Sequence, residues 1–209
     1  MKDIVIIGAG GHASEVVWLA KRCGRVIRGF LDNTPEKQNT FYHGFPVLGA
    51  LDDCSKFMDC DFIVAIGSPY ARQKVIKAYF QDINFTFATL IDPSALIGEN
   101  IRIGEGGMIC AGSILTVDVA IGIHCLVNTN AVLSHGVIGG DFVTVSPNAS
   151  ILGNVCLGDM VEVGANATIK EKLTIQDGAM IGMGAVVTKD VAKNHVMVGN
   201  PAKLLKVIG

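Results

Sequence analysis

With 209 residues, the chain could form one or two domains, and its composition of 50% hydrophobic and 17% charged residues is apolar without being membrane-like. The net charge of −2 gives no reason to expect a nucleic-acid partner, and no apolar run approaches the ~18 residues of a spanning helix, so we expect no membrane insertion. The start, Met1-Lys2-Asp3, has no signal-peptide pattern and the six cysteines include no CxxC pair, which predicts a cytoplasmic protein without a cysteine metal site.

The first part of the chain alternates predicted strands and helices. Strands are predicted at residues 4–7, 26–31, 62–66 and 85–90, and helices from the first glycine turn to about residue 21 and over residues 70–80. This alternation is typical of a parallel sheet. Ligands of such a sheet bind at the carboxyl ends of its strands.

A glycine-rich turn follows the first strand. Its sequence, Gly8-Ala9-Gly10-Gly11-His12-Ala13, fits G-x-G-x-x-A, the pattern of turns that hold a phosphate at a helix N-terminus. An acid at the end of the second strand, here Asp32, commonly binds a ribose hydroxyl. We therefore predict a nucleotide site formed by Gly8, Gly10, Gly11, His12, Asp32, Asn33, Gly67 and Ser68. The pattern also fits a tight turn without a ligand. A dinucleotide is disfavoured because it requires two mononucleotide halves, and only one precedes residue 91.

A six-residue period runs from Ile91 to Val191. The first position of the successive hexads holds Ile91, Ile97, Ile103, Ile109, Leu115, Ile121, Val127, Leu133, Gly139, Val145, Ile151, Leu157, Val163, Ile169, Ile175, Ile181 and Val187. All but Gly139 are Ile, Leu or Val. A hexapeptide period predicts a parallel β-helix.

The other hexad positions fit the same architecture. Position 5 is small or apolar throughout, as a narrow interior requires, and position 4 is mostly Asn, Gly or Asp, which tolerate a left-handed corner. Three hexads then close one triangular coil. Residues about eighteen apart should stack at roughly 4.8 Å, the spacing between strands.

His135 is the first candidate for catalysis. It occupies outward position 3 of its hexad, and its stacking neighbours are Val117 and Gly153. A glycine there leaves its backbone amide open beside the imidazole, so a base and an oxyanion donor lie together, as acyl transfer requires. The alternative is a solvated surface histidine.

The combination of motifs resembles a known family along essentially the whole chain. The motifs are GAGGHA at residues 8–13, FLDN at 30–33, PVLG at 46–49, NT at 128–129, LSH at 133–135, VSP at 145–147, GAVVTKD at 184–190 and GNPAK at 199–203. They resemble the sialic acid O-acyltransferase family of left-handed β-helix proteins. The resemblance implies an α/β Rossmann-like nucleotide-sugar domain at residues 1–88, a left-handed parallel β-helix at 89–193 and a C-terminal tail at 194–209.

The resemblance also implies an activity. Well-understood relatives transfer acetyl from acetyl-CoA to the 4-amino group of a nucleotide-linked dideoxy sugar, as trimers with active sites between neighbouring β-helices. We therefore expect a cytoplasmic, homotrimeric acetyl-CoA-dependent N-acetyltransferase of bacterial glycan biosynthesis. The expected substrate is a UDP-linked 4-amino-4,6-dideoxy sugar, and no metal is expected.

Family roles carry over to individual residues. The resemblance makes His135 the general base, Gly153 the amide that faces the thioester carbonyl, and Asn128 part of the acceptor site. It places cofactor contacts at Thr144, Ser146, Gly153 and Gly182. Two departures stand out, because relatives usually carry an acid where this chain has Gly136 and a histidine where it has Thr144.

Other functions remain possible for such a chain. An O-acetyltransferase of sialic acid or a related sugar, or a non-catalytic nucleotide-sugar-binding protein, would share most of these features. A β-helix carbonic anhydrase needs three converging histidines. His124, which we expect to be solvated at a corner, and His135 lie on different faces, and the hexads hold no third histidine, which disfavours that function.

Overall fold

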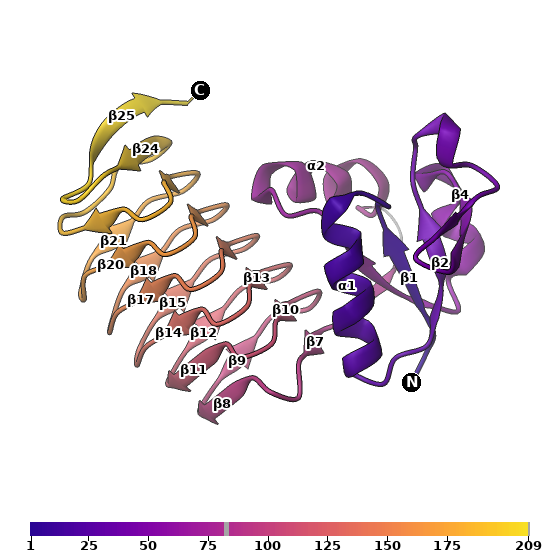
Figure 1. The fold of residues 1–209 in the computed structure, drawn as a ribbon, viewed down its shortest axis with the longest axis horizontal. Helices are drawn as coiled ribbons and strands as arrows, with labels where there is room; N and C mark the ends of the chain where they lie inside the picture. Colours follow the sequence, from indigo (N-terminus) through magenta and orange to yellow (C-terminus); the bar gives the residue numbers. More distant parts are fainter. Residues whose placement is uncertain (82–83, 209) are drawn as a thin grey trace.

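The computed structural model describes residues 1–81 and 84–208, and places an α/β unit beside a long stack of triangular coils (Figure 1). Residues 82, 83 and 209, which belong to the predicted first domain and tail, lie outside this description. Within the described ranges, no helix combines the length and apolarity needed to cross a bilayer.

The α/β unit is built on a six-stranded sheet in the order β3-β4-β2-β1-β5-β6. Its strands are β1 Ile4–Ile7, β2 Ile27–Leu31, β3 Phe41–Tyr42, β4 Phe45–Gly49, β5 Asp61–Val64 and β6 Thr86–Phe87. Its helices are α1 Gly11–Arg22 and α2 Pro69–Tyr79, with short 3-10 helices η1 Pro35–Lys37 and η2 Leu51–Phe57. All pairs are parallel except the β3–β4 hairpin, so the predicted parallel sheet is confirmed.

Two features of this unit differ from the sequence prediction. The β3–β4 hairpin was not foreseen, because its short strands carry no clear period. The single strand predicted at 85–90 is wrong, since β6 ends at Phe87 and a separate strand, β7 Leu90–Ile91, begins the coils. The two strands are separate because β6 pairs with β5 whereas β7 pairs with β10.

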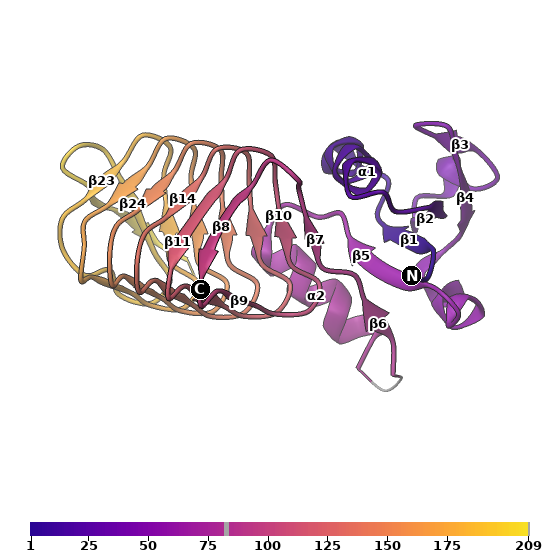
Figure 2. The same cartoon turned by 90° about the horizontal axis from the view of Figure 1, so that it is seen from below.

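The coils form the predicted parallel β-helix (Figure 2). Its further strands are β8 Leu96–Glu99, β9 Arg102–Ile103, β10 Met108–Ile109, β11 Ile114–Val117, β12 Ala120–Ile121, β13 Leu126–Val127, β14 Val132–Leu133, β15 Ile138–Gly139, β16 Thr144–Val145, β17 Ser150–Ile151, β18 Cys156–Leu157, β19 Glu162–Val163, β20 Thr168–Ile169, β21 Thr174–Ile175, β22 Met180–Ile181 and β23 Val186–Val187. Successive coils pair in parallel, for example Met108 with Leu126 and Leu126 with Thr144. The three faces are sheets of eight, six and five strands.

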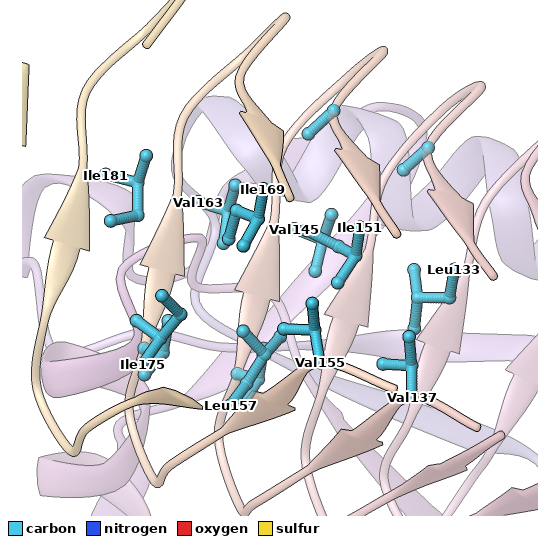
Figure 3. Packing of buried hydrophobic residues seen from close by; sticks show 14 of the residues in the cluster. Leu133, Val137, Val145, Ile151, Val155, Leu157, Val163, Ile169, Ile175 and Ile181 are labelled. Carbon is cyan, nitrogen blue, oxygen red and sulfur yellow. The ribbon is translucent and has the colours of Figure 1, made fainter. Parts of the chain in front are cut away.

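The interior of the β-helix is filled by the residues that the hexad pattern points inward. First-position side chains such as Leu133, Ile151 and Ile169 are fully buried and form one continuous column of packing (Figure 3). Every fourth-position residue from Asn100 to Gly184 has a left-handed φ between 53° and 73°. Both predictions from the hexad pattern are therefore confirmed.

The end of the chain extends the β-helix. We expected a tail at 194–209, but β24 His195–Val198 pairs in parallel with β22, and β25 Lys203–Val207 returns antiparallel to β24. Residues 195–198 thus add another strand to the eight-stranded sheet.

The α/β unit is joined to the β-helix through its two helices. Residues of α1 share a buried cluster with Leu90, Met108 and Leu126 on the outer side of the eight-stranded sheet. At the end of α1, Arg22 donates to both carboxylate oxygens of Asp92, at 2.5 and 2.8 Å.

Arg72, on α2, makes the second connection. It is fully buried, and its Nε donates to the His124 carbonyl at 2.8 Å while Nη2 donates to the Phe142 carbonyl and the Thr144 hydroxyl, both at 3.0 Å. Its Nη1 donates to the Ile66 carbonyl at 2.7 Å. Burial lowers the pKa of Arg72 to about 10, so it remains charged at neutral pH. The α/β unit is therefore held on the β-helix by charged hydrogen bonds as well as by apolar packing.

Candidate active site

A cavity of about 610 Å³ opens at the carboxyl ends of β1, β2 and β5. This is where ligands of a parallel sheet bind. The predicted residues Gly8, Asp32 and Asn33 line it. Lys74 and Tyr79 of α2 also line it and were not foreseen, because a helix reaching over the sheet edge leaves no local sequence pattern.

The glycine turn has the geometry of an anion site. Gly8 has φ +91°, which favours glycine, and an added side chain at Gly10 or Gly11 would meet nothing within 4 Å. Among the described residues, the backbone amides of Gly10, Gly11 and His12 find no acceptor. They therefore remain free at the positive end of α1.

Asp32 holds this turn in place. Its carboxylate accepts from the backbone amides of Ala9, at 2.7 Å, and Thr34, at 2.8 Å, and from Lys37 Nζ at 3.0 Å. Burial alone would raise its pKa, but hydrogen bonds from Thr34, Ala9 and Lys37 outweigh that effect and lower the pKa of Asp32 to about 2. Most of its accepting capacity is thus used within the chain rather than free for a ribose.

The neighbouring Asn33 is also fixed by the protein. Its amide nitrogen donates to the Tyr79 hydroxyl at 2.9 Å, and its oxygen accepts from the Leu51 amide at 2.8 Å. It ties β2 to α2 and η2 and shapes the wall of the cavity.

His12 lies at the start of α1 and is mostly covered. Its Nδ1 is 3.0 Å from the Glu15 carboxylate, and its Nε2 is buried without a partner among the described residues. Burial lowers its pKa, although Glu15 opposes the shift. His12 is therefore neutral near pH 7, with one ring nitrogen unused.

Gly67 and Ser68 do not line this cavity, and neither do Gly10, Gly11 and His12 of the glycine turn. The Gly67 carbonyl accepts from Thr144 Oγ1 at 2.9 Å and from Arg72 at 3.0 Å, and the Ser68 hydroxyl caps α2 by accepting from Ala71 N. Gly67 thus connects the start of α2 to the β-helix, whereas Ser68 fixes the first turn of α2.

His135 and Gly153 lie one coil apart, as the hexad pattern predicts. Asn154 N donates to the His135 carbonyl at 2.8 Å, which fixes the stacking. A Cβ added at Gly153 would overlap Nε2 of the imidazole and lie 2.5 Å from its Cε1. The exposed ring thus occupies the space left by the missing side chain. The Gly153 amide has no acceptor among the described residues.

Three other predicted residues lie at a different corner of the β-helix. Asn128, Ser146 and Gly182 come directly after strands of the eight-stranded sheet, whereas His135 comes after β14 of the six-stranded sheet. Asn128 lines a small cavity of about 70 Å³ with Glu15 and Trp18 of α1. A single chain therefore does not bring the His135 corner to the Asn128 corner.

The predicted cofactor contact at Thr144 does not fit its position. Its side chain is buried, and its hydroxyl is engaged by both Arg72 and the Gly67 carbonyl. Its place on the outer face of the eight-stranded sheet puts it under α2.

His124 is buried and not solvated, so that expectation is wrong. Its ring lies edge-on to Phe87 at 4.6 Å and stacks on Phe142 at 5.3 Å, and burial lowers its pKa to about 4. The sequence carried an unused signal, since His124, Phe142 and Met160 form one column of bulky residues at left-handed corners usually held by Asn or Gly. This column faces the α/β unit, since Arg72 donates to the carbonyls of His124 and Phe142.

No group of three or more His, Cys, Asp or Glu side chains within residues 1–81 and 84–208 could hold a metal ion.

A small α/β domain with a glycine-rich turn, followed by a hexapeptide β-helix, defines the class of left-handed β-helix acyltransferases.

Comparisons with known proteins place the chain within that class. The family described as PglD N-terminal domain matches residues 3–79. The structure is similar to perosamine N-acetyltransferase from Caulobacter crescentus, with 30% identity, TM-score 0.91, and coverage of 99% of this chain and 98% of that one. It is also similar to the acetyltransferase domain of PglB from Neisseria gonorrhoeae (29% identity, TM-score 0.91, 98% and 100% coverage) and to WeeI from Acinetobacter baumannii (29%, 0.87, 98% and 100%).

Curated relatives match over shorter stretches. UDP-N-acetylbacillosamine N-acetyltransferase of Bacillus subtilis is 30% identical over 116 residues, which cover 53% of this chain and 52% of that protein. An uncharacterized protein of Acanthamoeba polyphaga mimivirus is 30% identical over 119 residues, 57% of this chain and 23% of its own length. The chain thus spans about half of one curated relative and a quarter of the other. The chain belongs to the hexapeptide sugar acetyltransferases with a PglD-type N-terminal domain.

Proposed function

We propose that the protein transfers the acetyl group of acetyl-CoA to the amino group of a nucleotide-linked sugar. The observation that carries this proposal is the stacking of the exposed His135 ring on Gly153, in a chain that also holds a nucleotide-sized cavity at its glycine turn. Similar structures contain CoA and GDP-perosamine or acetyl coenzyme A, which supports these two substrates. Two of them are histidine mutants, which supports a role for a histidine.

The chemistry needs only the two bound substrates and this pair of residues. The amine nitrogen attacks the thioester carbonyl carbon, and His135 accepts the proton that the amine loses. The Gly153 amide donates to the oxyanion that develops on the carbonyl. The C–S bond then breaks, the amide product forms, and CoA leaves as a thiolate that takes up the proton.

Each active site would combine two chains. Because the His135 corner and the Asn128 corner lie on opposite edges of the six-stranded sheet, a neighbouring copy would supply the second corner. Exposed apolar side chains on the outer faces, such as Leu96 and Ile138, support contact between copies. We therefore propose a homotrimer, for which light scattering should give three times the 22.0 kDa chain mass.

The first candidate substrate is a UDP-linked 4-amino-4,6-dideoxy sugar in bacterial glycan biosynthesis. The UDP-N-acetylbacillosamine N-acetyltransferase of Bacillus subtilis supports UDP, whereas the perosamine enzyme supports GDP as the alternative. All six cysteines are free, which favours a reducing, cytoplasmic location.

The test incubates the protein with acetyl-CoA and either a UDP-linked or a GDP-linked 4-amino sugar. The rate of acetyl transfer is measured by titrating the free thiol of the CoA that is released. Replacing His135 by Ala should lower the rate by ~10²- to 10⁴-fold with little loss of stability, because the ring is exposed. The matched control is His43→Ala, since His43 is an exposed loop histidine of the α/β unit. Turnover by the His135 variant at the wild-type rate would refute the assigned base, and nucleotide-sugar binding without any turnover would favour a non-catalytic protein.

A further inference from the structure

The cavity of about 610 Å³ lies on the side of the sheet that α2 covers. Along β1, Ile4 and Ile6 pack with residues of α1 in one buried cluster, whereas Val5 and Ile7 pack with residues of α2 in another. The two helices therefore cover opposite faces, because the chain leaves β1 towards β2 and leaves β5 towards β6 in the opposite direction. A ligand in the crevice between β1 and β5 can thus reach the start of α1 at one end and α2 at the other.

These two ends suit different parts of a nucleotide. The unpartnered amides of Gly10, Gly11 and His12 suit a diphosphate, and they do not line the cavity. The cavity walls are mostly apolar and include Ile7, Pro35, Leu51, Ile66, Val75 and Ala78. A nucleotide held by its phosphates at α1 therefore has its base in the cavity against α2.

The Tyr79 hydroxyl enters the cavity as a donor. Asn33 Oδ1 accepts from the Leu51 amide at 2.8 Å, which fixes the orientation of the Asn33 side chain. Its amide nitrogen consequently donates to the Tyr79 oxygen at 2.9 Å. The proton of the Tyr79 hydroxyl has no acceptor among the described residues, so it is available to a ligand.

Lys74 is the second donor, and it lines the cavity from α2. Its ammonium forms no hydrogen bond or ion pair with residues 1–81 or 84–208, and it can only donate. Lys37, by contrast, does not line the cavity and is bonded to Asp32 and to the Ala9 carbonyl. The base end of the cavity therefore offers free donors from α2, while the carboxylate of Asp32 is used within the chain.

Nucleobases differ in what they present to such donors. Uracil carries the acceptor O4 where cytosine carries an amino group, and guanine carries the acceptor O6 where adenine carries an amino group. An amino group that faces an ammonium or a hydroxyl proton leaves both donors unpaired, which costs affinity.

We propose that Lys74, together with the Tyr79 hydroxyl, selects the base of the nucleotide-sugar by donating to a carbonyl oxygen. The proposal rests on the proposed function and adds to it the chemical class of the base, an oxo base such as uracil or guanine. It assigns Lys74 to the base and not to the phosphates.

The experiment measures, by calorimetric titration, the affinities of the wild type and of Lys74→Met for UDP and CDP, and for GDP and ADP. The members of each pair share their phosphates and ribose. The wild type should bind the oxo member of at least one pair about 10-fold more tightly than the amino member. In Lys74→Met this preference should fall below about threefold, while the affinity for the amino member stays the same.

Three further variants test the assignment. Lys74→Arg keeps a donor and should keep most of the preference. Tyr79→Phe removes only the hydroxyl and should lower the preference in part. Lys77→Met is the matched control, because Lys77 is also an exposed lysine of α2 but is bonded to Gln73 and does not line the cavity. It should bind all four nucleotides like the wild type.

Two results would overturn the proposal. One is an equal loss of affinity for both members of a pair in Lys74→Met, since it would place the ammonium at the shared phosphates. The other is a wild type that binds the two members of each pair equally well. If the wild type shows the preference but transfers no acetyl group from acetyl-CoA, the proposed function fails and the inference about the base stands.

Discussion

Replacing Gly153 by Ala should disable the enzyme while leaving it folded. The backbone at Gly153 is outside the left-handed region, so alanine is conformationally acceptable there. The added Cβ would nevertheless overlap Nε2 of His135 and lie 2.5 Å from Cε1 and 3.1 Å from Cδ2. Since carbon atoms pack at about 3.5–4.0 Å, the imidazole must move by about 1 Å.

The expected loss follows from that displacement. A misplacement of about 1 Å in a reacting group can cost ~10²-fold in rate, which corresponds to about 2.7 kcal/mol of barrier. The exposed ring can swing into solvent, so the melting temperature should change little. Steady-state CoA release gives kcat/KM, and a thermal melt run in parallel gives stability.

A control on the other side of the ring tests the geometry. Val117 lies one coil away in the same column, with its carbonyl accepting from Gly136 N at 3.1 Å. Val117→Ala only removes atoms and should leave the rate near that of the wild type. Wild-type activity in Gly153→Ala would refute the stacking argument, as would an equal loss of activity in the two variants.

Further predictions concern the contact between the α/β unit and the β-helix. Arg72→Met should reduce the free energy of unfolding by about 3–5 kcal/mol in urea titration, because several buried carbonyls lose their donor; a loss below about 1 kcal/mol would contradict this role. The pKa of His124 is about 4 in the folded chain, against an ordinary value of 6.5, so the unfolded chain binds this proton more tightly than the folded one. The full stability should therefore be present above about pH 6.5 and should fall as the pH drops towards 4. That difference in pKa, about 2.5, corresponds to about 3 kcal/mol in the free energy of unfolding. In thermal melts at pH 4–7, His124→Phe should therefore make the melting temperature depend less on pH. An unchanged pH dependence would show that other groups cause it.

The β-helix could be predicted almost completely from the sequence. In a coil of three hexads, the direction of each side chain follows from its position in the period, and its stacking partner lies one coil away. The burial of Leu133, the left-handed φ of Asn148 and the stacking of Gly153 on His135 all follow from this local rule. The glycine turn could likewise be located, because a strand, the glycines and a helix start are adjacent in sequence.

What lies on the outside of the β-helix was decided by tertiary structure. Thr144 and His124 occupy outward or corner positions, which the period predicts to be accessible, yet both are buried. Arg72 of α2 bonds to both residues across more than fifty positions of sequence, and Phe87 of the α/β unit packs on the His124 ring. Lys37 likewise meets Ala9 only because the segment that follows β2, with η1, folds back over the turn. The repeat determines which side chains point outward, but only the packing of the two units determines which of these are exposed to solvent. The reason is that apolar burial and the hydrogen bonds of charged donors involve residues that are distant in sequence, which no local pattern brings together.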